Sequence, residues 1–202
     1  MQTLNLIKLI LIYLIFFLIG GIPFGLILAK LKKVDLRKIG SGNIGATNVY
    51  RALGLRSAVL VFALDGLKGA APALICQWLF GKGILVGIAG LVAVLGQILS
   101  PYLKFKGGKG VATGFGAMAA ITPLPALLSL GIWILILAWS KIPGLASIIA
   151  AISLPLLILA LKPDAWILYT SLAIVIAVIL SHYSNISRLL QGKEKPIRGS
   201  RQ

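Results

Sequence analysis

Long apolar runs without a charged residue dominate this chain. Four of the runs hold 20 to 23 residues each: 9–29, 83–103, 142–161 and 165–187. An α-helix rises about 1.5 Å per residue, so about 20 apolar residues cross the hydrocarbon core of a bilayer. Each of these runs therefore predicts one transmembrane helix.

A fifth span is expected at about 57–79, where Asp65 and Lys68 interrupt the apolar sequence. Ionisable residues within a membrane are candidates for a functional site. These two lie three positions apart, so on a helix they can also pair. We interpret them as a pair that neutralises its own charge and serves the structure.

The charge-free run 110–140 has 31 residues, too many for one ordinary span. It contains Pro123 and Pro125, and proline breaks or kinks a helix. We therefore expect a short helix at 110–121, which either spans or re-enters, and a second helix at 124–140. The predicted fold is all-α, a polytopic membrane protein with seven transmembrane helices, one of them short.

The distribution of lysine and arginine supports this count, because cytoplasmic loops are enriched in both. With seven spans and the N-terminus outside, 16 of the 20 basic residues fall in segments predicted inside, and only Lys82 and Lys162 fall in outside loops. A single crossing at 110–140 would place the basic C-terminal tail on the opposite side from 30–56. The sequence thus predicts a cytoplasmic C-terminus.

Composition narrows the class of protein. The chain is 59% hydrophobic and 12% charged, with a formal net charge of +16. Such a chain lacks the polar surface of a soluble domain, so we interpret much of the charge as orientation signal and expect no nucleic-acid partner. One cysteine and one histidine argue against a disulfide framework and against Cys or multi-His metal sites. We expect no metal or cofactor, and one domain over 1–202 whose polar tail, 192–202, is frayed.

The first of three polar clusters on the predicted inner face contains Gly40-x-Gly42-x-x-Gly45. This matches the dinucleotide fingerprint only formally, because no βαβ unit surrounds it. The glycines still allow backbone N–H groups to converge on one anion. Further donors to such an anion are Ser41, Asn43, Thr47, Asn48 and Arg51. The alternative is a flexible loop with a helix cap.

The second cluster combines Lys104, Lys106 and Lys109 with Gly107, Gly108 and Gly110, and Thr113 follows. A glycine-rich turn that opens a helix offers unpaired N–H groups and the positive end of the helix dipole. A lysine is unfavourable there unless an anion binds. The alternative, a basic turn that flanks the membrane, explains the lysines but not the glycines.

The third cluster lies at the inner end of the last span. His182, Asn185 and Arg188 are spaced three apart and can share one side of a helix. The alternative is an interfacial helix end in which Arg188 contacts lipid headgroups. Ser147, about one turn into the sixth span, can bind a ligand or bond a neighbouring helix.

These clusters together resemble the three signatures of the bacterial acyl-phosphate:glycerol-3-phosphate acyltransferases. The matching segments are Gly40–Asn48, Phe105–Thr113 and His182-x-x-Asn185-Ile186-x-Arg188-Leu189. The resemblance covers nearly the whole chain. Two departures stand out: Gln97 replaces a usual histidine, and Tyr183-Ser184 replaces a usual Arg-acid pair.

The resemblance implies transfer of a fatty acyl group from acyl phosphate to the 1-hydroxyl of glycerol 3-phosphate, the first step of phospholipid synthesis. It implies a multi-pass protein of the bacterial inner membrane, in contact with lipid, whose active site faces the cytoplasm. Its catalytic residues would be Lys109, His182 and Asn185. Its substrate-binding residues would be Ser41, Gly42, Asn43, Thr47, Asn48, Arg51, Gly107, Gly108, Gly110, Thr113, Ser147 and Arg188.

Two other classes of protein remain open at this stage. A small organophosphate transporter would usually place its site near the midplane, between repeated halves, whereas here the polar clusters lie at one face and no repeat is evident. A basic membrane anchor would gather anionic lipid and account for the lysines only.

Overall fold

The computed structural model describes residues 6–161, 164–194 and 196–197, and in these ranges it contains helices and turns but no strand. The α-helices are α1 Leu6–Gly21, α2 Phe24–Leu31, α3 Ala46–Phe80, α4 Ile84–Ile98, α5 Val111–Ile121, α6 Pro123–Ser140, α7 Pro143–Ala160, α8 Ala165–Ser181 and α9 Tyr183–Leu190. Two 3-10 turns are η1, Leu36–Lys38, and η2, Pro101–Leu103.

The predicted break in the long apolar run is confirmed, and it falls at Thr122. Helix α5 ends at Ile121 and α6 begins at Pro123, whose ring fixes a φ suited to the first helical position and whose missing N–H is not needed there. The helix expected at 57–79 is longer than predicted. Helix α3 already begins at Ala46 and bends at Gly54, whose φ of 79° lies in the left-handed region.

The runs 9–29 and 165–187 do not form the two straight spans that their length suggested. Helices α1 and α2 meet at 40° across Ile22 and Pro23, where proline cannot continue the hydrogen-bond ladder. Helices α8 and α9 meet at 61°, with His182 at the corner. The run 83–103 also ends its α-helix early, at Ile98.

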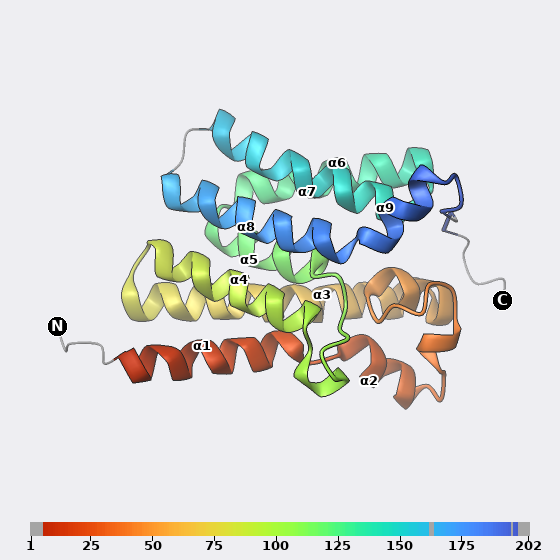
Figure 1. The fold of residues 1–202 in the computed structure, drawn as a ribbon, viewed down its shortest axis with the longest axis horizontal. Helices are drawn as coiled ribbons and strands as arrows, with labels where there is room; N and C mark the ends of the chain where they lie inside the picture. Colours follow the sequence, from red (N-terminus) through yellow and green to blue (C-terminus); the bar gives the residue numbers. More distant parts are fainter. Residues whose placement is uncertain (1–5, 162–163, 195, 198–202) are drawn as a thin grey trace.

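The helices pack side by side, and apart from the bent pairs α1–α2 and α8–α9 each helix reverses the direction of the one before it (Figure 1). Glycine permits a close approach between α3 and α5: a Cβ built on Gly69 or Gly116 would overlap the backbone of the other helix. The apolar core includes Val94, Met118 and Ile158, each fully buried.

Many large apolar side chains point outward, among them Trp78, Leu135 and Trp139, which are 70% to 83% exposed. Among the described helices, four are long and apolar enough to cross a membrane, or up to six when each bent pair counts as one span. Helix α5 is a shorter apolar helix of 11 residues. An outward-facing apolar surface of this kind is what lipid, and not water, accommodates.

Candidate active site

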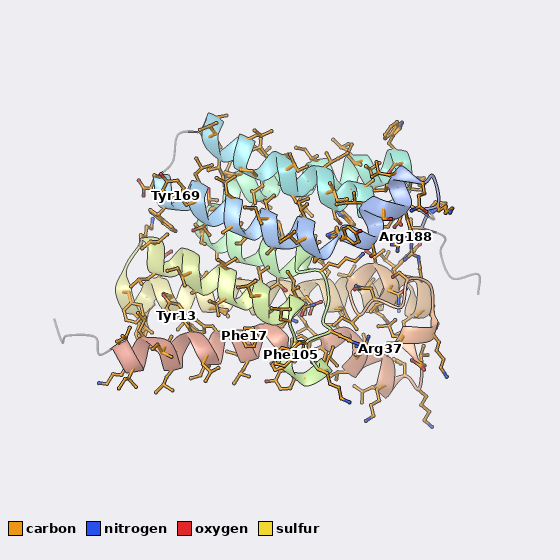
Figure 2. The ribbon with its side chains drawn as sticks, viewed as in Figure 1. Tyr13, Phe17, Arg37, Phe105, Tyr169 and Arg188 are labelled. Carbon is orange, nitrogen blue, oxygen red and sulfur yellow. The ribbon has the colours of Figure 1, made fainter. Side chains whose placement is uncertain are left out.

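The three polar clusters gather toward one end of the bundle. Figure 2 shows Arg37 and Arg188 at that end, while Tyr13 and Tyr169 lie at the other. In Figure 1 the same end carries α2, the loop that precedes α3, and the α8–α9 corner, and the loop between α4 and α5 reaches toward it. Segments far apart in the sequence therefore supply one polar region at the edge of an apolar bundle.

The first loop is folded by its own side chains. Asn48 is 1% exposed, its Nδ2 donates to Leu36 O at 3.0 Å, and its Oδ1 accepts from the backbone N–H of Ser41 at 3.1 Å. Asn43 Oδ1 accepts from Gly45 N at 2.9 Å. The side-chain oxygens of Asn43 and Asn48 thus shape the loop from within, whereas Ser41 remains exposed.

Arg51 lies on the first turns of α3, directly against this loop. A Cβ on Gly40, whose φ is 56°, would lie 2.8 Å from Arg51 Cδ and 2.6 Å from Asn48 Oδ1. Glycine is therefore required at position 40 both for the backbone conformation and for the space that Arg51 occupies. The half-buried Arg51 interacts electrostatically with Lys109 and Glu194, so it faces the other two clusters. Thr47, also half-buried, is on the same turn of α3.

The glycine-rich loop between α4 and α5 is tied to the end of α4. Gly107 N donates to Ile98 O at 3.0 Å and Gly108 N donates to Gln97 O at 2.9 Å. Gly110 then caps α5 with a φ of 74°. These bonds present Lys109 next to the positive end of the α5 dipole, as expected from the sequence.

Lys109 connects this loop to the α8–α9 corner. Its Nζ donates to Asn185 Oδ1, and its backbone oxygen accepts from Ser181 Oγ at 3.0 Å. Asn185 Nδ2 in turn donates to Glu194 Oε1 at 2.6 Å. The expected catalytic pair, Lys109 and Asn185, is therefore in direct contact.

Glu194 is a member of this cluster that the sequence did not reveal. Its second carboxylate oxygen accepts from Arg188 Nε at 2.5 Å, and its side chain is 9% exposed. The tail was expected to fray from residue 192, and residues 195 and 198–202 lie outside the described residues. The chain has only four Asp and Glu residues, so an isolated acid in its basic tail was the one feature of the sequence that could have pointed to Glu194.

His182 is buried at the corner that follows α8, with 2% exposure. Its Nδ1 lies 2.8 Å from Val178 O, which can only accept, so Nδ1 carries a proton and Nε2 is the free nitrogen. A neutral ring in this tautomer presents a lone pair on Nε2.

Burial also lowers the pKa of Lys109, from 10.5 to about 8. The carboxylate of Glu194 opposes that shift, whereas the charges of Arg188 and Arg51 add to it. Three cations thus surround one carboxylate, leaving an excess of positive charge. Such a site favours a dianion, which would restore the charged form of Lys109.

Two hydroxyl groups complete the set of expected residues. Ser147 on α7 accepts from Trp133 Nε1 at 3.0 Å and is 8% exposed. Gly144, one turn earlier, approaches Asn185 so closely that a Cβ would lie 2.8 Å from its Nδ2. Thr113 is fully buried in the first turn of α5, and its Oγ1 has no hydrogen-bond partner within the described ranges.

Cations and amides dominate the site, and the described residues contain no group of three or more His, Cys, Asp or Glu that could hold a metal ion. Bidentate and charge-assisted contacts from Arg and Lys suit phosphate. The arrangement can therefore bind anionic oxygens and offers one neutral imidazole beside them.

Comparison with known proteins agrees with this chemistry. A family model described as glycerol-3-phosphate acyltransferase matches residues 10–192. A glycerol-3-phosphate acyltransferase of Aquifex aeolicus is 46% identical over 179 residues, covering 88% of this chain and 93% of the relative. One of Geotalea daltonii is 44% identical over 178 residues, covering 88% and 92%.

Two crystal structures of PlsY, an integral membrane glycerol 3-phosphate acyltransferase, share the fold. Its glycerol 3-phosphate form superimposes with a TM-score of 0.89 at 43% identity, covering 95% of this chain and 96% of that one. Its lysophosphatidic acid form gives 0.88 at the same identity, covering 94% and 95%. The transporter alternative finds no support among these relatives. This chain is an integral membrane enzyme that belongs to the glycerol-3-phosphate acyltransferase family.

Proposed function

We propose that this acyltransferase uses acyl phosphate as its donor. The oxygen of the 1-hydroxyl of glycerol 3-phosphate attacks the acyl carbonyl carbon, and the bond from that carbon to the phosphate oxygen breaks. The products are lysophosphatidic acid and inorganic phosphate. The observation that supports this best is the excess of cations at one end of an apolar bundle, where Arg51, Lys109 and Arg188 surround only Glu194. Both substrates carry phosphate, and the donor also carries an apolar chain that lipid holds.

The orientation follows from the charges. We infer seven spans by counting α1–α2 and α8–α9 as one each and α5 as a short one. The excess of basic residues in the segments on one side then favours a cytoplasmic C-terminal tail and an N-terminus outside. The polar end of the bundle then lies on the cytoplasmic side of the bacterial inner membrane. Glycerol 3-phosphate enters from water, and the acyl donor enters from the adjacent lipid leaflet.

In the proposed mechanism, binding and charge stabilisation supply most of the rate enhancement, because an acyl phosphate already has a good leaving group. Lys109 and Arg51 hold phosphate, Asn185 orients Lys109, and Nε2 of His182 takes the hydroxyl proton. Thr47, Ser41, Gly42 and the N-terminal end of α5 at Gly110 line the anion pockets. The N–H groups of Gly107 and Gly108 donate to Ile98 O and Gln97 O, so they hold the loop in place. Thr113, Ser147 and Arg188 complete them.

Attack is direct, without an acyl-enzyme. Cys76, the sole cysteine, is fully buried in α3 and lies far along the chain from all three clusters. A nucleophile would need a base within hydrogen-bond reach. A radiolabelled acyl group that stays on the denatured, washed protein after incubation with acyl phosphate alone would contradict direct attack.

The donor is tested with protein purified in detergent. Acyl phosphate and glycerol 3-phosphate should give lysophosphatidic acid and inorganic phosphate in equal amounts. Acyl-CoA and acyl carrier protein thioesters of the same chain length should give none. Turnover with either thioester at a comparable rate would overturn the choice of donor while leaving the acyltransferase activity itself intact.

Removal of Arg51 should weaken substrate binding. Hydrogen bonds to charged groups contribute about 1.5–3 kcal/mol, so Arg51→Ala is expected to raise KM for glycerol 3-phosphate roughly 10- to 100-fold. Arg56→Ala is the matched control, since Arg56 is an exposed arginine on the same helix. A wild-type KM in Arg51→Ala would remove Arg51 from the phosphate site.

The pKa of Lys109 predicts a pH dependence. At about 8 it leaves the ammonium charged at pH 7 and mostly neutral at pH 9. Since phosphate needs the cation, kcat/KM for glycerol 3-phosphate should fall above about pH 8, approaching tenfold per pH unit, and kcat/KM reports the free enzyme. In Lys109→Arg this descending limb should disappear below pH 10. A limb that persists unchanged in Lys109→Arg would assign it to another group.

A further inference from the structure

A second cluster of polar side chains lies inside the bundle, away from the residues that hold substrate. Asp65 and Lys68 on α3 and Gln97 on α4 are each only 3% exposed. Lys68 Nζ lies 2.8 Å from Asp65 Oδ1, which confirms the pair expected from the sequence. Two buried charges and a buried amide in an apolar bundle are costly to desolvate, so their partners matter.

Lys68 joins segments from different parts of the chain. Besides Asp65, its ammonium donates to Ile22 O at 2.6 Å and to Gln97 Oε1. Ile22 lies in the break between α1 and α2, where the helix ladder is interrupted. Lys68 thus forms an ion pair with Asp65 on α3 and two hydrogen bonds, one to α4 and one to the α1–α2 break.

Gln97 carries this network to the glycine-rich loop. Its backbone oxygen accepts from Gly108 N at 2.9 Å, and the oxygen of the next residue, Ile98, accepts from Gly107 N. A Cβ on Gly108 would lie 2.7 Å from Gln97 Nε2, so the side-chain amide packs directly on the loop backbone. The next residue along the loop is Lys109.

The geometry points to a positioning role: we propose that the Asp65–Lys68 ion pair, acting through Gln97, fixes the glycine-rich loop that carries Lys109. Stability alone does not favour such a cluster, because apolar residues of similar volume usually stabilise a core as well or better. The cluster lies directly behind the loop, where it can hold the loop backbone in position. The effect on catalysis rests on the proposed role of Lys109, whereas the effect on the loop does not.

The test removes both charges together, so that neither is left unpaired. Asp65→Leu/Lys68→Met is compared with the wild type and with Tyr13→Phe, which removes a hydrogen bond to Leu85 O at the opposite end of the bundle. Two quantities are measured in detergent: kcat/KM for glycerol 3-phosphate, and the rates of trypsin cleavage at Lys104 and Lys106 in the loop relative to Lys82, which is exposed between α3 and α4.

The double variant should cleave several-fold faster at Lys104 and Lys106, with an unchanged rate at Lys82, and should lose at least tenfold in kcat/KM. Tyr13→Phe should change neither. Wild-type cleavage of the loop would overturn the proposal, and so would an equal acceleration at Lys82, which indicates general loosening. Faster loop cleavage with unchanged catalysis would contradict the assignment of Lys109 to substrate, not the support of the loop.

A second pair of variants keeps the ion pair and therefore tests the contact even if the double variant does not fold. Gly108→Ala should impair the wild type, yet cause little further loss on a Gln97→Ala background, where the amide is gone. Gly107→Ala is the matched control, because its Cβ would meet the backbone of Gln97 and Ile98 and so should impair both backgrounds. Equal losses from Gly108→Ala on both backgrounds would contradict the contact.

Discussion

Replacing Lys109 with methionine is expected to lower kcat/KM for glycerol 3-phosphate by about 10³-fold or more, the largest effect of any single change in this enzyme. Methionine keeps the apolar stem and deletes the charge. Loss of one preorganised donor to developing negative charge typically costs 10²- to 10³-fold in kcat, and lost binding of the phosphate adds to that. Steady-state kinetics over both substrates, with lysophosphatidic acid quantified, measure the loss.

Lys109→Arg separates charge from geometry. Arginine keeps the charge but is a planar fork, whereas Asn185 Oδ1 accepts from a compact ammonium. The arginine variant should therefore recover only part of the activity, and its acyl-phosphate kinetics should be less affected than those of the methionine variant. Near wild-type kcat/KM in Lys109→Met, with wild-type affinity for glycerol 3-phosphate, would exclude Lys109 from the anion site.

Much of the architecture was predictable because the lipid environment restricts it. The lengths of the apolar runs predicted where the helices lie, and Pro123 predicted the break after α5. The distribution of basic residues predicted that all three polar clusters lie on one face. The bends were not predictable from length. Charge-free sequence continues through Pro23 and through His182, so hydropathy registers no end where the backbone turns by 40° and 61°.

The role of each polar residue in the site was harder to predict than its location. From the sequence we expected Asn48 to donate to an anion, yet its buried amide forms hydrogen bonds with the backbone of Leu36 and Ser41 and shapes the loop. Glu194 was missed for the opposite reason. A polar tail predicts no structure by itself, and only the folded chain brings its carboxylate between Asn185 and Arg188. The sequence shows which side chains can donate or accept a hydrogen bond, whereas the partner of each side chain depends on how the chain packs.

His182→Gln is expected to lower kcat about 10²- to 10³-fold and to leave KM for glycerol 3-phosphate within about threefold, as for loss of a general base. The hydrogen bond from Nδ1 to Val178 O holds the ring and leaves Nε2 as the acceptor. A neutral ring in this tautomer can accept the hydroxyl proton at Nε2, and a bound phosphate dianion stabilises the imidazolium that forms.

Two further variants decide whether His182 is a base or a binder. His182→Ala should match His182→Gln in kcat if the proton acceptor is what matters, because neither side chain can take a proton. Thr170→Val is the control for damage to α8, because Thr170 is buried near the N-terminal end of that helix, away from His182. A near-normal kcat with a raised KM in both histidine variants would make His182 a phosphate ligand, and the proton would then pass to the phosphate of the substrate itself.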